Sequence, residues 1–219
     1  TNYDHFQKFL KKNIPVVFVD RVPDDINTTK VVINNYEAGF KATQHLIEQG
    51  CTRIAHIGGV RHRNVYKERM DGYVAALRQY DLTIDDNLII ESDRLSSEEG
   101  FRIAKYLLNL PERPDGIFSA NDTAAVSLIK YAKSVGVDIP NDVAVIGFNN
   151  DPISTIIDPP LSTIIHPAIE MGKLAATQVL NREDQTDIVK SQTIMLDTEL
   201  IVRESSRRVA IPKESITKA

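Results

Sequence analysis

Four short clusters of polar residues, each following an apolar run, carry the side chains that are best suited to binding a ligand. They are Asp20-Arg21 after residues 15–19, Arg69 beyond Gly58-Gly59, Asn121-Asp122 after 116–119, and Asn149-Asn150-Asp151 after 143–148. A carboxylate accepts hydrogen bonds from two hydroxyl groups, an amide donates and accepts, and an arginine donates through a planar fork. Together these groups suit a neutral ligand that carries several hydroxyl groups.

Each candidate residue also has a purely structural interpretation. Phe118 or Phe148 could lie against the apolar face of a sugar ring or base, but a phenylalanine in a strand is more often part of the core. Asp122 is well placed to cap a helix. Asp20 could simply end its strand, and Arg69 could form an ordinary surface ion pair. The residue types alone leave both interpretations open.

The sequence contains no pattern that would support catalysis or hold a metal ion. Its five histidines lack the spacing of metal ligands, and its single cysteine, Cys51, has no sequence neighbour that would activate it. Gly58-Gly59 lacks the rest of a phosphate-binding loop, and no G-x-S-x-G elbow occurs. We therefore expect no catalytic residue, no metal site and no cofactor.

The elements that must position the polar clusters alternate between strands and helices. Strands are predicted at 15–19, 53–57, 88–90, 116–119, 143–148, 161–165 and 193–202, and helices at 36–49, 66–80, 96–108, 121–135 and 168–182. This alternation predicts an α/β fold with a mostly parallel sheet covered on both faces. Because ligands bind at the carboxyl ends of such strands, the four clusters should meet at one edge of a sheet.

Composition limits the class of protein. The 219 residues are 42% hydrophobic and 26% charged, with a net charge of −4, so the charge does not indicate a nucleic-acid surface. No apolar run approaches the roughly 20 residues needed to span a bilayer, and no signal peptide is visible. A single cysteine excludes an intrachain disulfide. We expect a cytoplasmic protein, and the missing initiator Met indicates a fragment.

Several stretches, in the same order, resemble the regulatory core of LacI/GalR transcription regulators. They are IPVVFVDR at 14–21, GCTRIAHIGG at 50–59, RMDGY at 69–73, PDGIFSAND at 114–122, VAVIGFNND at 143–151, PLSTI at 160–164 and TELIVRESS at 198–206. The resemblance implies a two-lobed type I fold of the periplasmic-binding-protein kind, with the effector bound between the lobes.

The resemblance also implies how the chain is divided. The N-terminal lobe would comprise 1–32 and 164–190, the C-terminal lobe 33–163 and 191–208, and a tail 209–219, with crossings near 21–33, 162–166 and 188–194. The first lobe would be incomplete, because the family core starts with two further strands and two helices. It would keep only a helix near 3–12, the strand 16–19 and the helix 168–182.

Effector contacts carried over from the family fall on Asp20, Arg69, Asn121 and Asn149, with Phe118 as a wall of the pocket. Many relatives have Asp at the position of Asn149, and an amide cannot replace a charged acceptor. The effector of an Asp-bearing relative therefore does not transfer directly, although a sugar is favoured over a purine.

The partners implied by the resemblance are a small-molecule effector, a second copy of the protein and operator DNA. Operator DNA would be bound through a helix-turn-helix head that this chain does not contain. No membrane partner is expected. Two alternatives remain: a periplasmic sugar-binding protein of an ABC transporter, which has the same fold, and an α/β enzyme, for which no nucleophile and base pair is visible.

Overall fold

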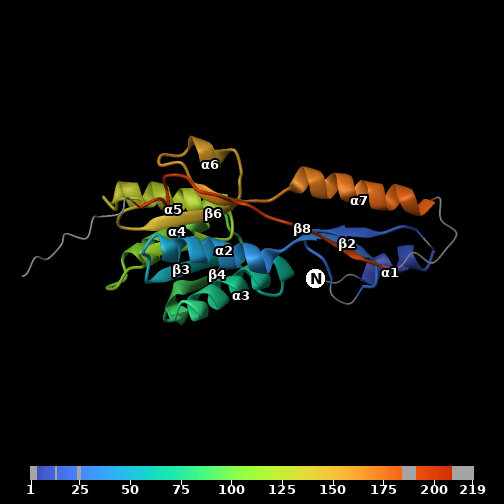
Figure 1. The fold of residues 1–219 in the computed structure, drawn as a ribbon, viewed down its shortest axis with the longest axis horizontal. Coiled ribbons are helices and arrows are strands. Elements are labelled where there is room, and N and C mark those ends of the chain that lie inside the picture. The colour runs from blue at the N-terminus through green and yellow to red at the C-terminus, as the bar shows by residue number, and fades with distance from the viewer. Residues whose placement is uncertain (1–3, 13, 24–25, 184–190, 209–219) are drawn as a thin grey trace, which may run out of the picture.

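The chain forms two lobes that lie end to end in a computed structural model, which describes residues 4–12, 14–23, 26–183 and 191–208 (Figure 1). The larger lobe is built on a six-stranded sheet with the order β4-β3-β5-β6-β7-β9. Its strands are β3 (Ile54–Gly59), β4 (Ile89–Ser92), β5 (Gly116–Ser119), β6 (Ala144–Asn149), β7 (Ser162–Ile165) and β9 (Leu200–Ile201). All neighbouring strands are parallel except β9, which runs antiparallel to β7.

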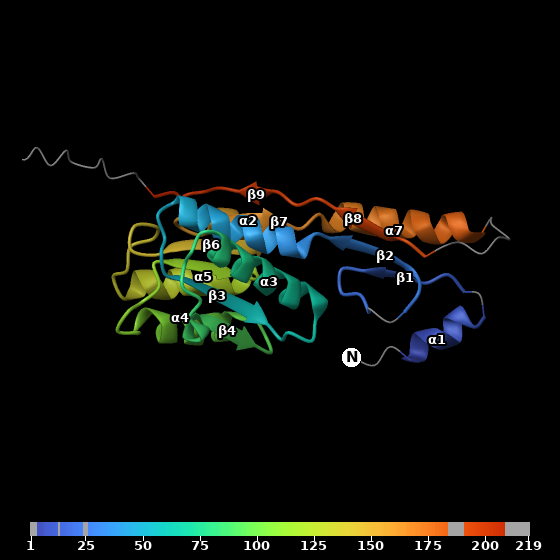
Figure 2. The ribbon, with the colours of Figure 1, turned by 60° about the horizontal axis from the view of Figure 1, so that its bottom comes forward.

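Helices cover both faces of the large sheet (Figure 2). They are α2 (Asn35–Glu48) and α3 (Asn64–Gln79) on one face, and α4 (Ser97–Leu108) and α5 (Asp122–Ser134) on the other. Successive strand residues point to opposite faces, so Ile117 packs in the core under α4 and α5 and Phe118 in the core under α2 and α3. A short 3₁₀ turn (Asp86–Leu88) precedes β4, and α6 (Ile153–Ile156) precedes β7.

The smaller lobe is built on a three-stranded parallel sheet with the order β1-β2-β8. Its elements are α1 (Asp4–Leu10), β1 (Val17–Val19), β2 (Thr29–Ile33), α7 (Ala168–Glu183) and β8 (Thr193–Leu196). Helix α7 contacts β1 and β2. Helix α1 packs on β1 through Phe6, whose ring centre lies 4.9 Å from that of Phe18. The small sheet is thus covered by α1, which precedes its strands, and by α7, which follows the large lobe in the chain.

The α/β class and the helix-flanked parallel sheets confirm the prediction from sequence. The strand β2 was missed, because its β-branched run Thr29–Ile33 follows polar residues and was assigned to a crossing. Pairing of β8 with β2 also corrects the assignment of all of 191–208 to the large lobe. The chain crosses between the lobes directly after β2, after β7 and after β8. The crossing after β7 falls within the predicted range 162–166, and the other two lie just beyond the predicted ranges 21–33 and 188–194.

Helices α2 and α3 cross with their backbones in close contact. A Cβ atom added to Gly39 would lie 2.2 Å from the carbonyl oxygen of Arg69, and one added to Gly72 would lie 2.1 Å from the carbonyl oxygen of Tyr36. Only glycine allows this approach. The crossing therefore fixes the position of Arg69, one of the predicted site residues, relative to the large sheet.

The variant Gly39→Ala should lower the free energy of unfolding by about 1–3 kcal/mol, because the helices must separate to admit the methyl group. Urea unfolding followed by circular dichroism measures the change. The matched control is Gly172→Ala in α7, where the added Cβ has no neighbour within 4 Å. That control should raise the stability by about 0.5–1 kcal/mol, since alanine is the better helix former. Equal effects of the two variants would contradict the close crossing.

Candidate ligand-binding site

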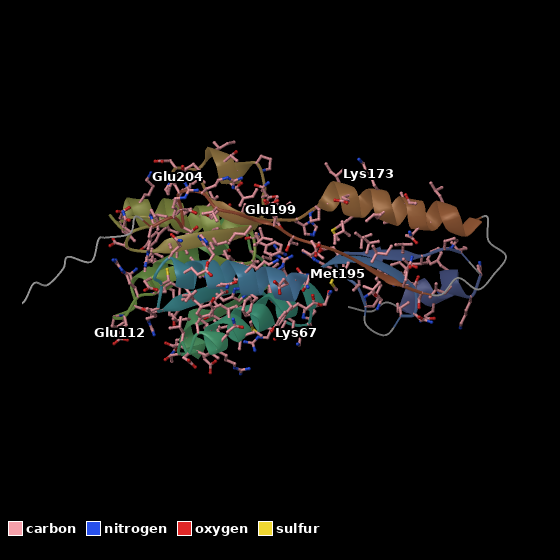
Figure 3. The ribbon with its side chains drawn as sticks, viewed as in Figure 1. Lys67, Glu112, Lys173, Met195, Glu199 and Glu204 are labelled. Carbon is pink, nitrogen blue, oxygen red and sulfur yellow. The ribbon has the colours of Figure 1, made fainter. Side chains whose placement is uncertain are left out.

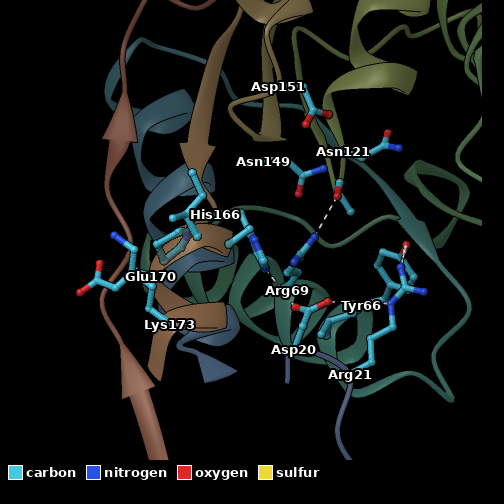
Figure 4. Close-up of a pocket in the computed structure, with 15 residues that line it drawn as sticks. Asp20, Arg21, Tyr66, Arg69, Asn121, Asn149, Asp151, His166, Glu170 and Lys173 are labelled. Atoms are coloured by element: carbon cyan, nitrogen blue, oxygen red, sulfur yellow. Dashed lines mark hydrogen bonds and ion pairs between the residues drawn. The ribbon is translucent and has the colours of Figure 1, made fainter. Parts of the chain in front are cut away.

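A cavity of about 1000 Å³ lies where the two lobes meet (Figure 4). Its walls come from the ends of β1, β5 and β6, from the start of α3, and from the segment joining β7 to α7. The lining residues are Asp20, Arg21, Val65, Tyr66, Arg69, Ala120, Asn121, Asn149, Asp151, His166, Pro167, Ala168, Ile169, Glu170 and Lys173. The carboxyl ends of strands from both sheets therefore meet at this cavity, whereas the sequence predicted that the clusters meet at one edge of a single sheet.

Arg69 is buried at the centre of the site, with 4% of its surface exposed. Its Nε donates to Asn35 Oδ1 at 2.8 Å, its Nη1 donates to the carbonyl oxygen of Ala120 at 2.9 Å, and its guanidinium lies 3.5 Å from the ring centre of Phe148. Burial lowers the pKa of Arg69 to about 10, although the negative charge of Asp20 works in the opposite direction. The guanidinium is therefore still charged at neutral pH, and the bonds found among the described residues leave Nη2 for a ligand. The structural alternative for Arg69, an ordinary surface ion pair, does not hold because the side chain is buried.

Asp20 follows β1 and faces Arg69 across the cavity. Its φ of 64° lies in the left-handed region, which aspartate tolerates better than most residues. His166 Nε2 donates to Asp20 Oδ1 at 3.1 Å. Burial alone would raise the pKa of Asp20, but the hydrogen bond and charge of His166, together with the charges of Arg69 and Arg21, lower it. The carboxylate is thus ionised and can accept hydrogen bonds from a ligand.

The two asparagines predicted for the site differ in how far their side-chain amides are already used in hydrogen bonds. Asn121 caps α5: its Oδ1 accepts from the Ala124 backbone N–H at 3.0 Å and its Nδ2 donates to the Leu95 carbonyl oxygen at 2.8 Å. Within the part of the chain that the structure describes, the Asn149 side chain makes no hydrogen bond, and its φ is 114°. Asn149 therefore has its whole amide available to a ligand, whereas Asn121 has only its remaining donor and acceptor capacity.

The cap prediction for Asp122 is wrong, because the preceding residue Asn121 fills that position. Asp122 is fully buried outside the cavity lining. Its carboxylate accepts from Thr163 Oγ1 at 2.7 Å and from the Asp151 backbone N–H at 2.7 Å. Burial raises its pKa to about 6, with the two hydrogen bonds acting in the opposite direction. Asp122 thus ties the cavity loop at Asp151 to strand β7.

Phe118 is not a wall of the cavity, contrary to the prediction. Its side chain is completely buried and packs against His56, with ring centres 4.8 Å apart, in the core under α2 and α3. The physical reason is that a strand side chain stands perpendicular to its sheet, so residue 118 points into the face rather than past the strand end. Ala120 and Asn121, which follow the strand, reach the cavity instead.

Tyr66 supplies the aromatic surface that was assigned to Phe118, and sequence reasoning missed it. Its ring packs on Gly59, where an added Cβ would lie 2.3 Å from the ring. The guanidinium carbons of Arg21 and Arg69 lie 5.8 Å and 5.9 Å from its ring centre. Tyr66 precedes Arg69 by three residues on α3, and that helical spacing was the signal available in the sequence.

Residues at the start of α7 were also missed, and they complete the charge balance of the cavity. His166, Glu170 and Lys173 lie on the side opposite Asn121 in Figure 4. The acidic lining residues are Asp20, Asp151 and Glu170, and the basic ones are Arg21, Arg69 and Lys173. Three carboxylates face three lysine and arginine cations, so the two signs of charge are balanced apart from His166. This balance suits a neutral, hydrogen-bonding ligand.

Neither a metal site nor a membrane span is found among the residues that the structure describes. No group of three or more His, Cys, Asp or Glu side chains in the described ranges could hold a metal ion. No helix there is long and apolar enough to cross a bilayer.

Residues 43–206 match the family model described as the periplasmic binding protein-like domain. The chain belongs to this family. It is 34% identical over 193 residues to the HTH-type transcriptional repressor CytR of Escherichia coli, covering 88% of this chain and 56% of CytR. The chain thus spans little more than half the length of that relative.

Solved structures place the chain among LacI-family regulators. A regulatory protein of the LacI family from Chloroflexus aggregans matches with a TM-score of 0.84 and 30% identity, over 94% of this chain and 73% of that protein. The transcriptional regulator CelR in complex with cellobiose matches with a TM-score of 0.82 and 30% identity, over 91% of this chain and 61% of CelR. These relatives are transcription regulators rather than enzymes.

The variant Asp122→Asn should remove one component of the pH dependence of stability. The folded-state pKa of about 6 lies above the ordinary value of 3.8, so folding favours the protonated carboxyl and this contribution to stability falls as pH rises from 4 through 6. Over the whole titration the wild type should lose on the order of 3 kcal/mol relative to the variant, of which about 2 kcal/mol falls between pH 4 and pH 6. Urea unfolding at pH 4.5, 5.5 and 7 measures this difference. Parallel pH profiles for the two proteins would contradict the assignment.

Proposed function

We propose that this chain senses a neutral sugar in the cavity between its lobes and that the sugar controls the DNA-binding activity of a LacI-type regulator. The main support for the proposal is that Asp20 on the small lobe lines the same cavity as Arg69 and Asn149 on the large lobe. A ligand that bonds to all three must contact both lobes. The cellobiose bound to the similar regulator CelR supports the sugar class.

The chemistry of the lining favours hydroxyl groups over charged groups. Asp20 accepts, Arg69 donates through its remaining nitrogen, and the free amide of Asn149 does both. Tyr66 offers a half-buried ring against which the apolar face of a sugar can lie. A strongly anionic ligand would meet the carboxylates of Asp151 and Glu170 as well as the cations.

A ligand held by both lobes changes the relative stability of their orientations. Its contribution equals the difference in its affinity for the two arrangements, and only that difference can be transmitted to DNA binding. In the proposed regulator, operator DNA is bound by a helix-turn-helix head joined to this chain, and the protein acts as a homodimer. Both partners are implied by the family.

A thermal-shift screen of the chain against sugars, sugar phosphates and purines tests the proposal. A ligand present at about 100 times its Kd adds about 2.7 kcal/mol to stability, which is readily seen as a higher Tm. We expect selective stabilisation by a neutral sugar. Stabilisation by purines alone, or by no member of the panel, would remove the sugar assignment.

The variant Asn149→Gly should weaken binding of the sugar that the screen selects by about five- to tenfold, the loss of one hydrogen bond to the ligand. Glycine adopts the φ of 114° without strain, so the fold should be unaffected or slightly stabilised. Isothermal titration calorimetry measures the affinity. The matched control is Asp81→Gly, which relieves a φ of 53° in an exposed turn away from the cavity and should leave the Kd unchanged. Unchanged affinity in Asn149→Gly would remove Asn149 from the site.

A further inference from the structure

Arg203 lies outside the cavity yet contacts the loop that forms part of its wall. We propose that Arg203 is a positioning residue for the ligand site, which holds the loop 149–151 in the conformation that presents Asn149 to the ligand. Its effect on the loop is independent of the ligand, whereas its effect on affinity rests on the proposed function.

The backbone of the loop 149–151 has a conformation that needs support from neighbouring side chains. Asn149 and Asn150 are consecutive non-glycine residues with φ values of 114° and 57°. Such residues cost free energy and persist where the surrounding structure fixes them. The residues on both sides of Asn150, namely Asn149 and Asp151, line the cavity. A return of Asn150 to negative φ would therefore redirect two lining residues at once.

Three contacts fix Asn150, and Arg203 makes the charged one. Arg203 Nη2 donates to Asn150 Oδ1 at 2.8 Å, and Ser154 Oγ donates to the same oxygen at 3.4 Å. The backbone N–H of Asn150 donates to Thr163 Oγ1 at 3.2 Å. A hydrogen bond from a charged donor is about twice as strong as a neutral one, so Arg203 is the principal restraint on this side chain.

Arg203 is itself firmly held. It follows β9, in a segment that runs along the large lobe between the labelled residues Glu199 and Glu204 in Figure 3. Its backbone N–H donates to Ser162 Oγ at 2.8 Å, and its Nη1 donates to Ser154 Oγ at 3.2 Å and to the carbonyl oxygen of Leu161. The planar fork of an arginine reaches these acceptors and Asn150 together, which the single ammonium of a lysine does not.

The test is the conformation of the loop in the whole chain without ligand. In Arg203→Met, the backbone amide NMR signals of 149–151 and the side-chain amide signals of Asn149 and Asn150 should move, while the backbone signals of β3 stay in place. Arg203→Lys serves as the second variant if the methionine variant does not fold. Unchanged loop signals in a folded Arg203 variant would overturn the proposal.

A control separates positioning from simple anchoring of the C-terminal segment. Ser205 anchors the same segment, since its Oγ donates to the Val145 carbonyl oxygen at 2.7 Å and accepts from the Ser162 N–H at 2.8 Å, but it does not contact Asn150. Ser205→Ala should lower the Tm and leave the loop signals unchanged. Equal displacement of the loop by Ser205→Ala would overturn a specific role for Arg203.

Affinity for cellobiose, used as the neutral sugar probe, gives the functional readout. We expect Arg203→Met to raise the Kd by about tenfold. In the Asn150→Gly background the same substitution should raise the Kd by less than about twofold, because glycine keeps positive φ without the restraint from Arg203. If the losses of binding free energy caused by Arg203→Met and Asn150→Gly were additive, this mechanism would be contradicted. If the loop moves in Arg203→Met but the wild type binds no sugar in the screen, the positioning role stands and the proposed function fails.

Discussion

The structure depends on burying the charge of one guanidinium, that of Arg69. Burying a cation is costly unless it gains hydrogen bonds and compensating charge, and here an amide oxygen, a carbonyl oxygen and an aromatic face compensate Arg69. Each of these groups comes from a different element: Asn35 begins α2, Ala120 follows β5 and Phe148 lies in β6. The crossing of α2 and α3 at Gly39 and Gly72 brings Arg69 to Asn35. The contacts that pack the large lobe therefore also position Arg69 in the site.

The charge of Arg69 also organises the boundary between the lobes. It lowers the pKa of Asp20 on the small lobe, where His166 makes the direct hydrogen bond. His166 follows β7, the second of the strands after which the chain crosses between lobes. On the large lobe, Asp122 links β7 to the loop that carries Asp151. Hydrogen bonds thus connect the cavity loop, the crossing strand and the facing carboxylate.

The sequence predicted the residues that follow strands more successfully than those on helices. Asp20, Asn121 and Asn149 line the cavity because the carboxyl ends of parallel strands converge, a rule that needs no coordinates. Arg69, which was also predicted, lines the cavity from helix α3. Phe118 was misplaced because an apolar residue within a strand points into a sheet face, and proximity along the chain to Asn121 does not change that. The roles of Asp20, Arg69, Asn121 and Asn149 as ligand contacts stay predictions.

Other features depend on contacts between distant segments, which local patterns do not record. Lys173 reaches the cavity only because α7 packs on the small sheet and starts at the crossing. The sequence of β2 resembles that of a linker, and only the pairing of β2 with β1 and β8 identifies it as a strand. Arg203 is 53 residues from Asn150 along the chain, and no periodicity indicates that they touch. A helical spacing of three residues would have revealed Tyr66.

A single sugar that contacts both lobes must perturb both of them at the same ligand concentration. Titration of the isotopically labelled chain with the sugar selected by the screen, followed by amide NMR, detects this. We expect the signals of Asp20 on the small lobe and of Asn149 on the large lobe to shift together and to saturate with one Kd. Shifts confined to one lobe, or centred on the separate hollow at Glu91, Ser92 and Arg102, would contradict it.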